Sequence, residues 1–368
     1  MVRRVLLAGL LLGPAVIVAH YAFDLSETTE FVVAALALVP LAWLIGESTE
    51  HAAEYTGPGI GGFLNATFGN APELIIALLA LHEGLTGVVR GSLTGSVIGN
   101  LLLVLGFSLV AGGRGEIDRW SSLVSLSLIG LAVALFFIPS IVSWSGDPER
   151  QAIVRISVPI SIVLLVVYVI VTIGALRRHS TQHVSSDDEI DGWTFPQSLL
   201  ALGVATVVTA LVAEVLVGSL EVFAAQVGMS DFFVAAVIVA IVGNAAEHGG
   251  AVIVAHRGKI TLAAEIALSS AAQVAVFLIP AVVLLSWLID PLALGFRQIE
   301  MAALVFAVAV TAVTLHGGRS SRLRGGILLA AYAMVAAAFW VAGQDGRGVA
   351  STSAPKLSGA LVTGYVAK

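Results

Sequence analysis

Two short segments place a carboxylate and an amide inside long apolar runs. The first reads Gly-Asn-Ala-Pro-Glu and carries Asn70 and Glu73, and the second reads Gly-Asn-Ala-Ala-Glu and carries Asn244 and Glu247. Residues three apart share one face of a helix. A charged group inside a bilayer costs about 3 kcal/mol on the lenient insertion scale, and it persists where it faces a cavity, an ion or a partner. These residues therefore predict a site for a cation or for protons.

The donor atoms of this predicted site favour a hard divalent cation. Two carboxylates balance one doubly charged ion, and Ca²⁺ accepts six to eight oxygen ligands in flexible geometry, whereas Mg²⁺ needs a stricter octahedron. Softer metals prefer thiolate or imidazole, and the chain has no cysteine. An empty site with two like charges is costly, so protons replace a departing cation. The pair thus predicts exchange of a cation for protons, provided that both acids face one cavity. The competing interpretation is a protonated acid that is hydrogen-bonded within the helix bundle.

The composition indicates an all-α polytopic membrane protein. Of 368 residues, 58% are hydrophobic and 11% are charged, and the mean hydropathy is +0.99, whereas soluble domains carry about 25% charged residues. Apolar runs of about 20 residues recur along the whole chain, and they are continuous rather than alternating, which favours helices over a barrel. These runs imply a lipid bilayer as partner. Nucleic acid is not expected as a partner, because no cluster of basic residues is long enough to bind a row of phosphates.

We expect about eleven transmembrane helices in a cell membrane. Residues 1–25 form the first, in preference to a cleaved signal peptide, and residues 26–180 and 195–342 form two groups of five, joined by an acidic linker at 181–194 and followed by a small-residue tail at 343–368. Loop arginines and lysines place the N-terminus in the cytoplasm and the C-terminus outside. The predicted spans are 4–23, 31–54, 60–82, 86–112, 119–140, 152–175, 195–221, 229–256, 260–289, 298–316 and 322–342.

The two signature segments belong to an internal repeat. One shift of 174 residues carries Glu73 onto Glu247, Ser96 onto Ser270 and Gly84 onto Gly258. Five spans separate the copies, and because five is odd, the second copy crosses the membrane in the opposite sense. The expected fold is one helix plus two inverted five-helix repeats, an arrangement of secondary transporters whose site lies where broken helices of both halves meet. Gly69 and Gly243 are the expected break points.

The segments "GNAPELIIALLALHEG" and "GNAAEHGGAVIVAHRG" resemble the two signature repeats of the calcium/proton exchanger (CAX) family, within the cation/calcium exchanger superfamily. The resemblance covers about residues 30–342. It implies a secondary antiporter rather than an enzyme, with no cofactor, that transports Ca²⁺ and H⁺ by alternating access. The cation ligands that it implies are Glu73, Glu247, Asn70, Asn244, Ser96, Ser270 and Gln273.

The resemblance leaves one ligand position empty and suggests a path to the site. Gly99 stands where the family usually has a small hydroxyl residue. Glu50 and Glu221 resemble acids that are thought to carry protons or cations to the site. Weaker candidates for the same path are Glu54, Glu214 and, because imidazole can relay protons, His248.

Three further functions remain open. A sodium-coupled exchanger of the same superfamily is the first alternative, although Asn70 and Asn244 stand where that branch tends to have hydroxyl residues. An intramembrane metalloenzyme is the second, but "EHAAE" and "AEH" lack a helical pair of histidines. A cation channel is the third, and it has no need of mirrored half-sites. Along residues 86–112, Gly87, Gly91, Gly95 and Gly99 form a stripe that serves either sliding or, as we favour, close helix packing.

Overall fold

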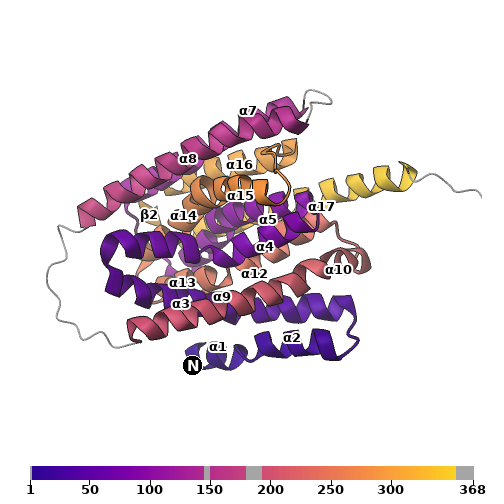
Figure 1. Ribbon diagram of the computed structural model, residues 1–368. Coiled ribbons are helices and arrows are strands. Elements are labelled where there is room, and N and C mark those ends of the chain that lie inside the picture. Colours follow the sequence, from indigo (N-terminus) through magenta and orange to yellow (C-terminus); the bar gives the residue numbers. More distant parts are fainter. Residues whose placement is uncertain (1, 145–149, 180–192, 354–368) are drawn as a thin grey trace, which may run out of the picture.

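The computed structural model describes residues 2–144, 150–179 and 193–353, and almost all of them are helical (Figure 1). Apolar segments of this length satisfy their backbone groups internally only as helices. In chain order the described elements are α1 (Val2–Gly9), α2 (Leu12–Ala22), α3 (Glu27–Phe68), α4 (Ala71–His82), α5 (Thr86–Ile98), η1 (Gly99–Val104), α6 (Leu105–Gly112), β1 (Gly115–Glu116), α7 (Arg119–Trp144), α8 (Arg150–His179), α9 (Phe195–Gly218), α10 (Leu220–Gln226), α11 (Asp231–Phe233), η2 (Val234–Val239), α12 (Ala240–Gly243), α13 (Ala245–His256), α14 (Ile260–Gln273), η3 (Val274–Leu278), α15 (Ile279–Leu285), η4 (Ser286–Leu288), α16 (Gln298–Leu315), β2 (Arg319–Ser320) and α17 (Arg322–Ser353).

Among the described residues, nine helical stretches are long and apolar enough to cross a bilayer. A tenth results if α10 and the segment Asp231–Gly243, which meet at 110°, form one span. The apolar helix α4 is shorter than a span. The all-α polytopic membrane fold is therefore confirmed, while the count of eleven and the inverted repeat stay predictions.

The predicted loop between the second and third spans is wrong. Instead, α3 continues without interruption from Glu27 to Phe68, and Figure 1 shows its later part turning towards α4. Pro58 lies inside this helix, and a proline can bend a helix without ending it. Just before it, the Thr56 hydroxyl donates to the carbonyls of Ala52 and Ala53 at 3.2 and 3.3 Å, which gives those carbonyls a further partner.

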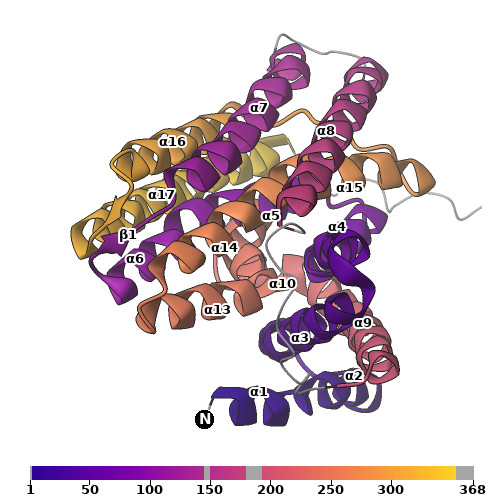
Figure 2. The same cartoon turned by 90° about the vertical axis from the view of Figure 1, so that its left-hand side faces the viewer.

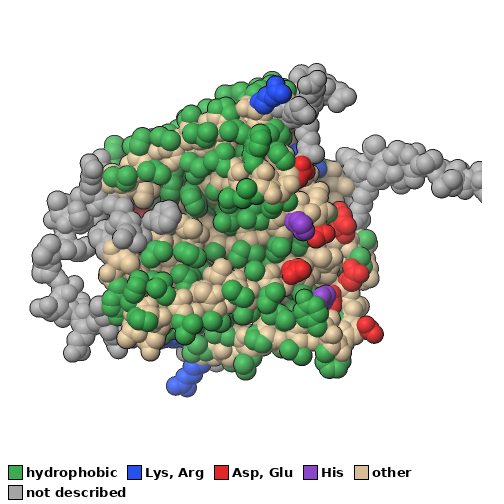
Figure 3. Space-filling model, in the orientation of Figure 1, with side chains coloured by type: hydrophobic (Ala, Val, Ile, Leu, Met, Phe, Trp, Pro, Cys, Tyr) green, Lys and Arg blue, Asp and Glu red, His purple; other side chains and the backbone are tan. Residues whose placement is uncertain are grey.

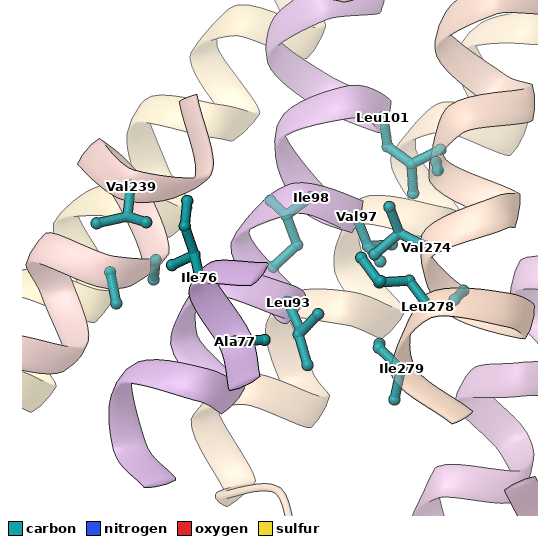
Figure 4. Packing of buried hydrophobic residues seen from close by; sticks show 14 of the residues in the cluster. Ile76, Ala77, Leu93, Val97, Ile98, Leu101, Val239, Val274, Leu278 and Ile279 are labelled. Atoms are coloured by element: carbon teal, nitrogen blue, oxygen red, sulfur yellow. The ribbon is translucent and has the colours of Figure 1, made fainter. Parts of the chain in front are cut away.

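The helices divide into two sides with the broken segments between them. Figure 2 shows α1, α2, α3 and α9 on one side and α7, α16 and α17 on the other. The α3 helix packs along α9, whereas α4 contacts α9 and α13 contacts α3. Apolar side chains of both halves meet in the interior. Figure 4 shows this packing for Ile76, Ala77, Leu93, Val97, Ile98, Leu101, Val239, Val274, Leu278 and Ile279.

Two long helical spans contain π-helical turns at nearly matched places. Within Thr86–Gly112 the turn is η1, and within Ile260–Leu288 it is η3. Pro280 is the second residue after η3 and cannot donate to the carbonyl of Val276, which explains part of the departure from α-helix. The irregularity near Pro280 is thus a π-helical turn rather than a break, because α15 continues the span from Ile279. No proline accompanies η1, so packing must contribute as well.

A short strand pair joins two connections that are distant in the sequence. β1 pairs with β2 in antiparallel register, Gly115 opposite Ser320, and the Ser320 hydroxyl donates to the carbonyl of Gly113 at 2.7 Å. At the C-terminal end, α17 continues to Ser353, beyond the predicted last span. Most of the predicted acidic linker and the end of the predicted tail lie outside the described residues.

Candidate cation site

Two helices break at the signature segments, as the sequence predicted. Asn70 occupies the N-cap of α4 with φ −100° and ψ 17°, and Asn244 occupies the N-cap of α13 with φ −93° and ψ 10°. Both following helices have 12 residues. They are followed by Gly84 and Gly258, whose positive φ values of 75° and 83° suit glycine. The shift of 174 residues therefore relates two segments with the same local backbone geometry.

Each signature asparagine bonds to a helix of the other half of the chain. Asn70 Nδ2 donates to Gln273 Oε1 at 3.2 Å, whereas Asn244 Nδ2 donates to Ser96 Oγ at 2.9 Å. Both asparagines and Ser96 are at most 2% exposed. Since buried amides need hydrogen-bond partners, these contacts tie the two half-sites together.

The carboxylate of Glu73 lies against the break in the other half. A Cβ added at Gly243 would stand 3.3 Å from Glu73 Cγ, so Gly243 permits this close approach. Glu73 is 7% exposed, and its Oε2 has no hydrogen-bond partner among the described residues. A buried carboxylate oxygen of this kind needs a proton or a cation to offset its lost hydration.

Glu247 completes the site from the second half. It is part-buried and accepts a hydrogen bond from the hydroxyl of Ser270, which is itself buried. The arrangement is therefore asymmetric: Glu247 has a hydroxyl donor, whereas Ser96, the counterpart of Ser270, bonds to Asn244 instead.

The oxygen atoms of this site fit a hard cation as transported substrate. The described residues contain no group of three or more histidine, cysteine, aspartate or glutamate side chains placed to hold a metal. A cation between Glu73 and Glu247 would therefore depend on two carboxylates and on neutral amide and hydroxyl oxygens. Ca²⁺ tolerates such a mixed and irregular ligand set.

The predicted path residues Glu50 and Glu221 lie apart from each other. Glu50, Glu54 and Glu221 are exposed, and Glu54 pairs with His51 at 3.7 Å. The start of α3 meets α10 through a hydrogen bond from Thr28 to Gln226. Glu221 is thus near the beginning of α3. Glu50 lies 23 residues after Glu27, the first residue of α3, which corresponds to about 35 Å along a helix.

Two other predicted path residues have different surroundings. Glu214 lines a cavity of about 340 Å³ together with Glu27, Glu30 and Glu83, at the end of the molecule where Figure 3 shows acidic side chains gathered. The backbone N–H of His248 donates to the carbonyl of Asn244 at 2.9 Å. Its buried Nε2 has no hydrogen-bond partner among the described residues.

Sequence reasoning missed Asn100. This residue is fully buried in η1, and its Nδ2 donates to the carbonyl of Ser96 at 3.0 Å and to Asn244 Oδ1 at 3.3 Å. The available signal was an amide in the middle of the apolar run "SVIGNLLLVLG". The internal repeat gives no indication of this residue, because the shift of 174 places a valine, Val274, at the matching position.

The glycine stripe serves close packing at its centre. A Cβ on Gly95 would lie 2.0 Å from the carbonyl oxygen of Ala236, and one on Gly91 would lie 3.0 Å from that of Phe232. Gly87 and Gly99 have no atom within 4 Å of such a Cβ. Close helix packing, the interpretation that we favour, therefore applies to Gly91 and Gly95.

Comparison with known proteins gives consistent matches over most of the chain. The model of the family described as sodium/calcium exchanger protein matches residues 28–177 and 197–341. A Ca(2+)/H(+) antiporter of Synechocystis is 36% identical over 362 residues, covering 92% of this chain and 97% of that protein. The Ca(2+)/H(+) antiporter ChaA of Bacillus subtilis is 38% identical over 324 residues, covering 84% and 92%. The solved structure of native YfkE is 36% identical, with a TM-score of 0.78, and covers 93% of this chain and 100% of its own.

Proposed function

The chain belongs to the sodium/calcium exchanger protein family, and on that premise we propose that it exchanges Ca²⁺ for H⁺ across a membrane. It is a secondary transporter and not an enzyme, as its relatives are. The relatives that are 36% and 38% identical are named Ca(2+)/H(+) antiporters. This similarity favours protons over sodium as the coupling ion.

The observation that carries the proposal is the meeting of both signature segments at one buried region. Glu73 packs against Gly243, which precedes Glu247 by four residues, and each signature asparagine bonds to the other half of the chain. One Ca²⁺ neutralises both acids, and so do protons, whereas the empty site with two charges is the costly state. The protein therefore switches between its inward-facing and outward-facing states when the site holds Ca²⁺ or protons. It does not switch when the site is empty and charged, and this restriction is the coupling that an antiporter requires.

The proposed ligands divide into charged and neutral groups. Glu73 and Glu247 supply the charge, and amide and hydroxyl oxygens complete the coordination. The neutral ligands proposed are Asn70, Asn244, Ser96, Ser270 and Gln273.

The proposed transport cycle is alternating access within an inverted repeat. Matched breaks at Asn70 and Asn244 and the matched glycines Gly84 and Gly258 support the repeat. Glu50 and Glu221 lie near opposite ends of the molecule, which suits two separate approaches to one central site. We place the N-terminus in the cytoplasm and the C-terminus outside. The reason is that the loops on the same side of the membrane as the N-terminus contain more arginines and lysines than the loops on the other side.

Uptake into vesicles tests this function directly. Purified protein in sodium-free liposomes is expected to accumulate Ca²⁺ when a pH gradient is imposed, and to stop when the gradient is collapsed. Uptake that needs a sodium gradient instead would support the sodium-coupled alternative and overturn the proposal.

Two single substitutions test the site. Glu73→Gln and Glu247→Gln are each expected to reduce exchange at least about 100-fold, because one charge of the site is lost. Glu116→Gln is the control, since Glu116 is an exposed glutamate that does not line the acidic cavity around Glu214. Exchange at the wild-type rate by both site variants would refute the ligand assignment.

A further inference from the structure

The turn between α16 and β2 brings two arginine side chains together. Arg119 Nη2 donates to the carbonyl of Gly317 at 2.8 Å, and Arg324 Nη1 donates to the carbonyl of Arg319. Two glycines make room for both groups. An added Cβ would lie 3.0 Å from Arg324 Nη2 at Gly317 and 2.5 Å from Arg119 Nε at Gly318. The two guanidinium groups therefore flank adjacent residues of one turn.

Further arginines surround this turn, and few acids offset them. Together they form an arginine cluster, which consists of Arg114, Arg119, Arg319, Arg322 and Arg324. The nearby acids are Glu116, which is exposed, and Asp118, whose two oxygens accept from the backbone N–H groups of Trp120 and Ser121 at 3.0 and 3.4 Å. Among the described residues, no arginine of the cluster forms an ion pair. Because like charges held close together repel each other, the cluster attracts an anion.

Exposed apolar side chains adjoin the arginine cluster. Trp120, at the start of α7, is 62% exposed, and Leu323, at the start of α17, is 76% exposed. Both helices pack against α16 and lie on the same side of the helix bundle (Figure 2). A tryptophan beside basic residues at the end of a membrane span is typical of the membrane–water interface. The surface around the turn is therefore positively charged at its centre and apolar at its edge.

We propose that the arginine cluster binds the headgroup phosphate of an anionic phospholipid. Arg119 and Arg324 hold the phosphate, and Trp120 and Leu323 lie against the acyl chains. The planar guanidinium group fits phosphate oxygens, and each of the two groups has five N–H donors, of which a backbone carbonyl takes one. A free phosphate would contact only the charged centre of this surface, whereas a phospholipid also covers its apolar edge. Basic pockets between the ends of membrane helices bind anionic headgroups in this way.

Quenching of tryptophan fluorescence by brominated lipid measures this binding at Trp120. The full chain is reconstituted in phosphatidylcholine that contains a rising fraction of phosphatidylglycerol with brominated acyl chains, which quench tryptophan on contact. The signal of Trp120 is the difference between each protein and the same protein with Trp120→Phe. A parallel series with brominated phosphatidylcholine gives the relative binding constant of the anionic lipid. We expect this constant to favour phosphatidylglycerol at least about tenfold, and excess inorganic phosphate to leave it unchanged.

Variants of the cluster separate a lipid site from the overall charge. An arginine near an anionic membrane surface strengthens binding about fivefold, so Arg119→Gln/Arg324→Gln should lower the relative binding constant about 25-fold. Arg322 is exposed, so Arg322→Gln leaves both carbonyl contacts of the turn in place and should lower the constant about fivefold. Arg3→Gln/Arg4→Gln is the matched control. It removes the same charge from α1, on the other side of the bundle (Figure 2), and should leave the constant unchanged.

The outcomes decide between a lipid site, a free anion and a general charge effect. Equal quenching of wild-type Trp120 by the two brominated lipids would overturn the proposal. So would an unchanged constant in either variant of the cluster, or an equal loss in Arg3→Gln/Arg4→Gln. Displacement of the lipid by inorganic phosphate would identify a free anion as the ligand and would also overturn it. Because the readout is lipid binding rather than transport, none of these results depends on the proposed exchange of Ca²⁺ for H⁺.

Discussion

Substitution of Gly95 tests whether the close approach of two helices sets the geometry of the site. A Cβ at this position would lie 2.0 Å from the carbonyl oxygen and 2.7 Å from the carbonyl carbon of Ala236 in η2. Such contacts essentially never fall below 3.0 Å, so α5 and η2 must separate by at least about 1 Å, and overpacking of this kind costs about 1–3 kcal/mol of stability.

The same displacement acts on the site, because Ser96 follows Gly95 directly and Asn244 lies shortly after η2. Their hydrogen bond of 2.9 Å would lengthen towards about 3.9 Å, which is no longer a hydrogen bond. By analogy with active sites, where a misplacement of about 1 Å can cost about 100-fold, we expect Gly95→Ala to lose exchange by about that factor.

Gly87→Ala is the matched control for this substitution. Gly87 lies two helical turns earlier on α5, and an added Cβ there meets no atom within 4 Å. Proton-driven Ca²⁺ uptake and the thermal unfolding midpoint should be measured for both variants in parallel. Equal uptake by Gly95→Ala and Gly87→Ala would refute the argument that this approach positions the site.

Three further predictions concern the carboxylates and the fold. Ser270→Ala removes the hydroxyl that donates to Glu247. Because a hydrogen bond to a charged group is lost, the KM for Ca²⁺ should rise about 10- to 100-fold. An unchanged KM would contradict the support of Glu247 by Ser270. Lowering the pH on the side where Ca²⁺ binds protonates Glu73 and Glu247, so protons compete with Ca²⁺ and the apparent KM for Ca²⁺ should rise by roughly 10- to 100-fold per pH unit. A KM that is independent of pH would count against this competition. Ser320→Ala removes bonds to the carbonyls of Gly113 and Gly115 at 2.7 and 3.3 Å and should reduce stability by about 1–2 kcal/mol without changing the KM; a changed KM would link the strand pair to transport.

The sequence predicted those features that depend on local chemistry. Helix breaks at Gly69 and Gly243 follow from the residue types there and from their repetition. The meeting of Asn70 with Gln273, and of Asn244 with Ser96, follows from the expectation that two inverted halves share one site. These contacts join residues more than 140 positions apart, and the family resemblance, which implies that they are ligands of one cation, led us to expect them together.

Other features depend on tertiary packing and could not be derived. The α3 helix continues through Pro58, where a local rule predicts an end. The π-helical turns η1 and η3 have no distinct residue pattern, and η1 lacks even a nearby proline. Asn100 was missed because it breaks the repeat, and only its hydrogen bonds to Ser96 and Asn244 show that it lies at the site.

The central claim is that Glu73 and Glu247 bind either one Ca²⁺ or protons, and proton release on Ca²⁺ binding tests it most directly. Purified protein in weakly buffered detergent solution should release protons when Ca²⁺ is added, as followed with a pH indicator. Glu73→Gln and Glu247→Gln should each lose both Ca²⁺ binding and this release, while Glu116→Gln should keep them. Tight Ca²⁺ binding without any proton release, or with unchanged release in both site variants, would contradict the account.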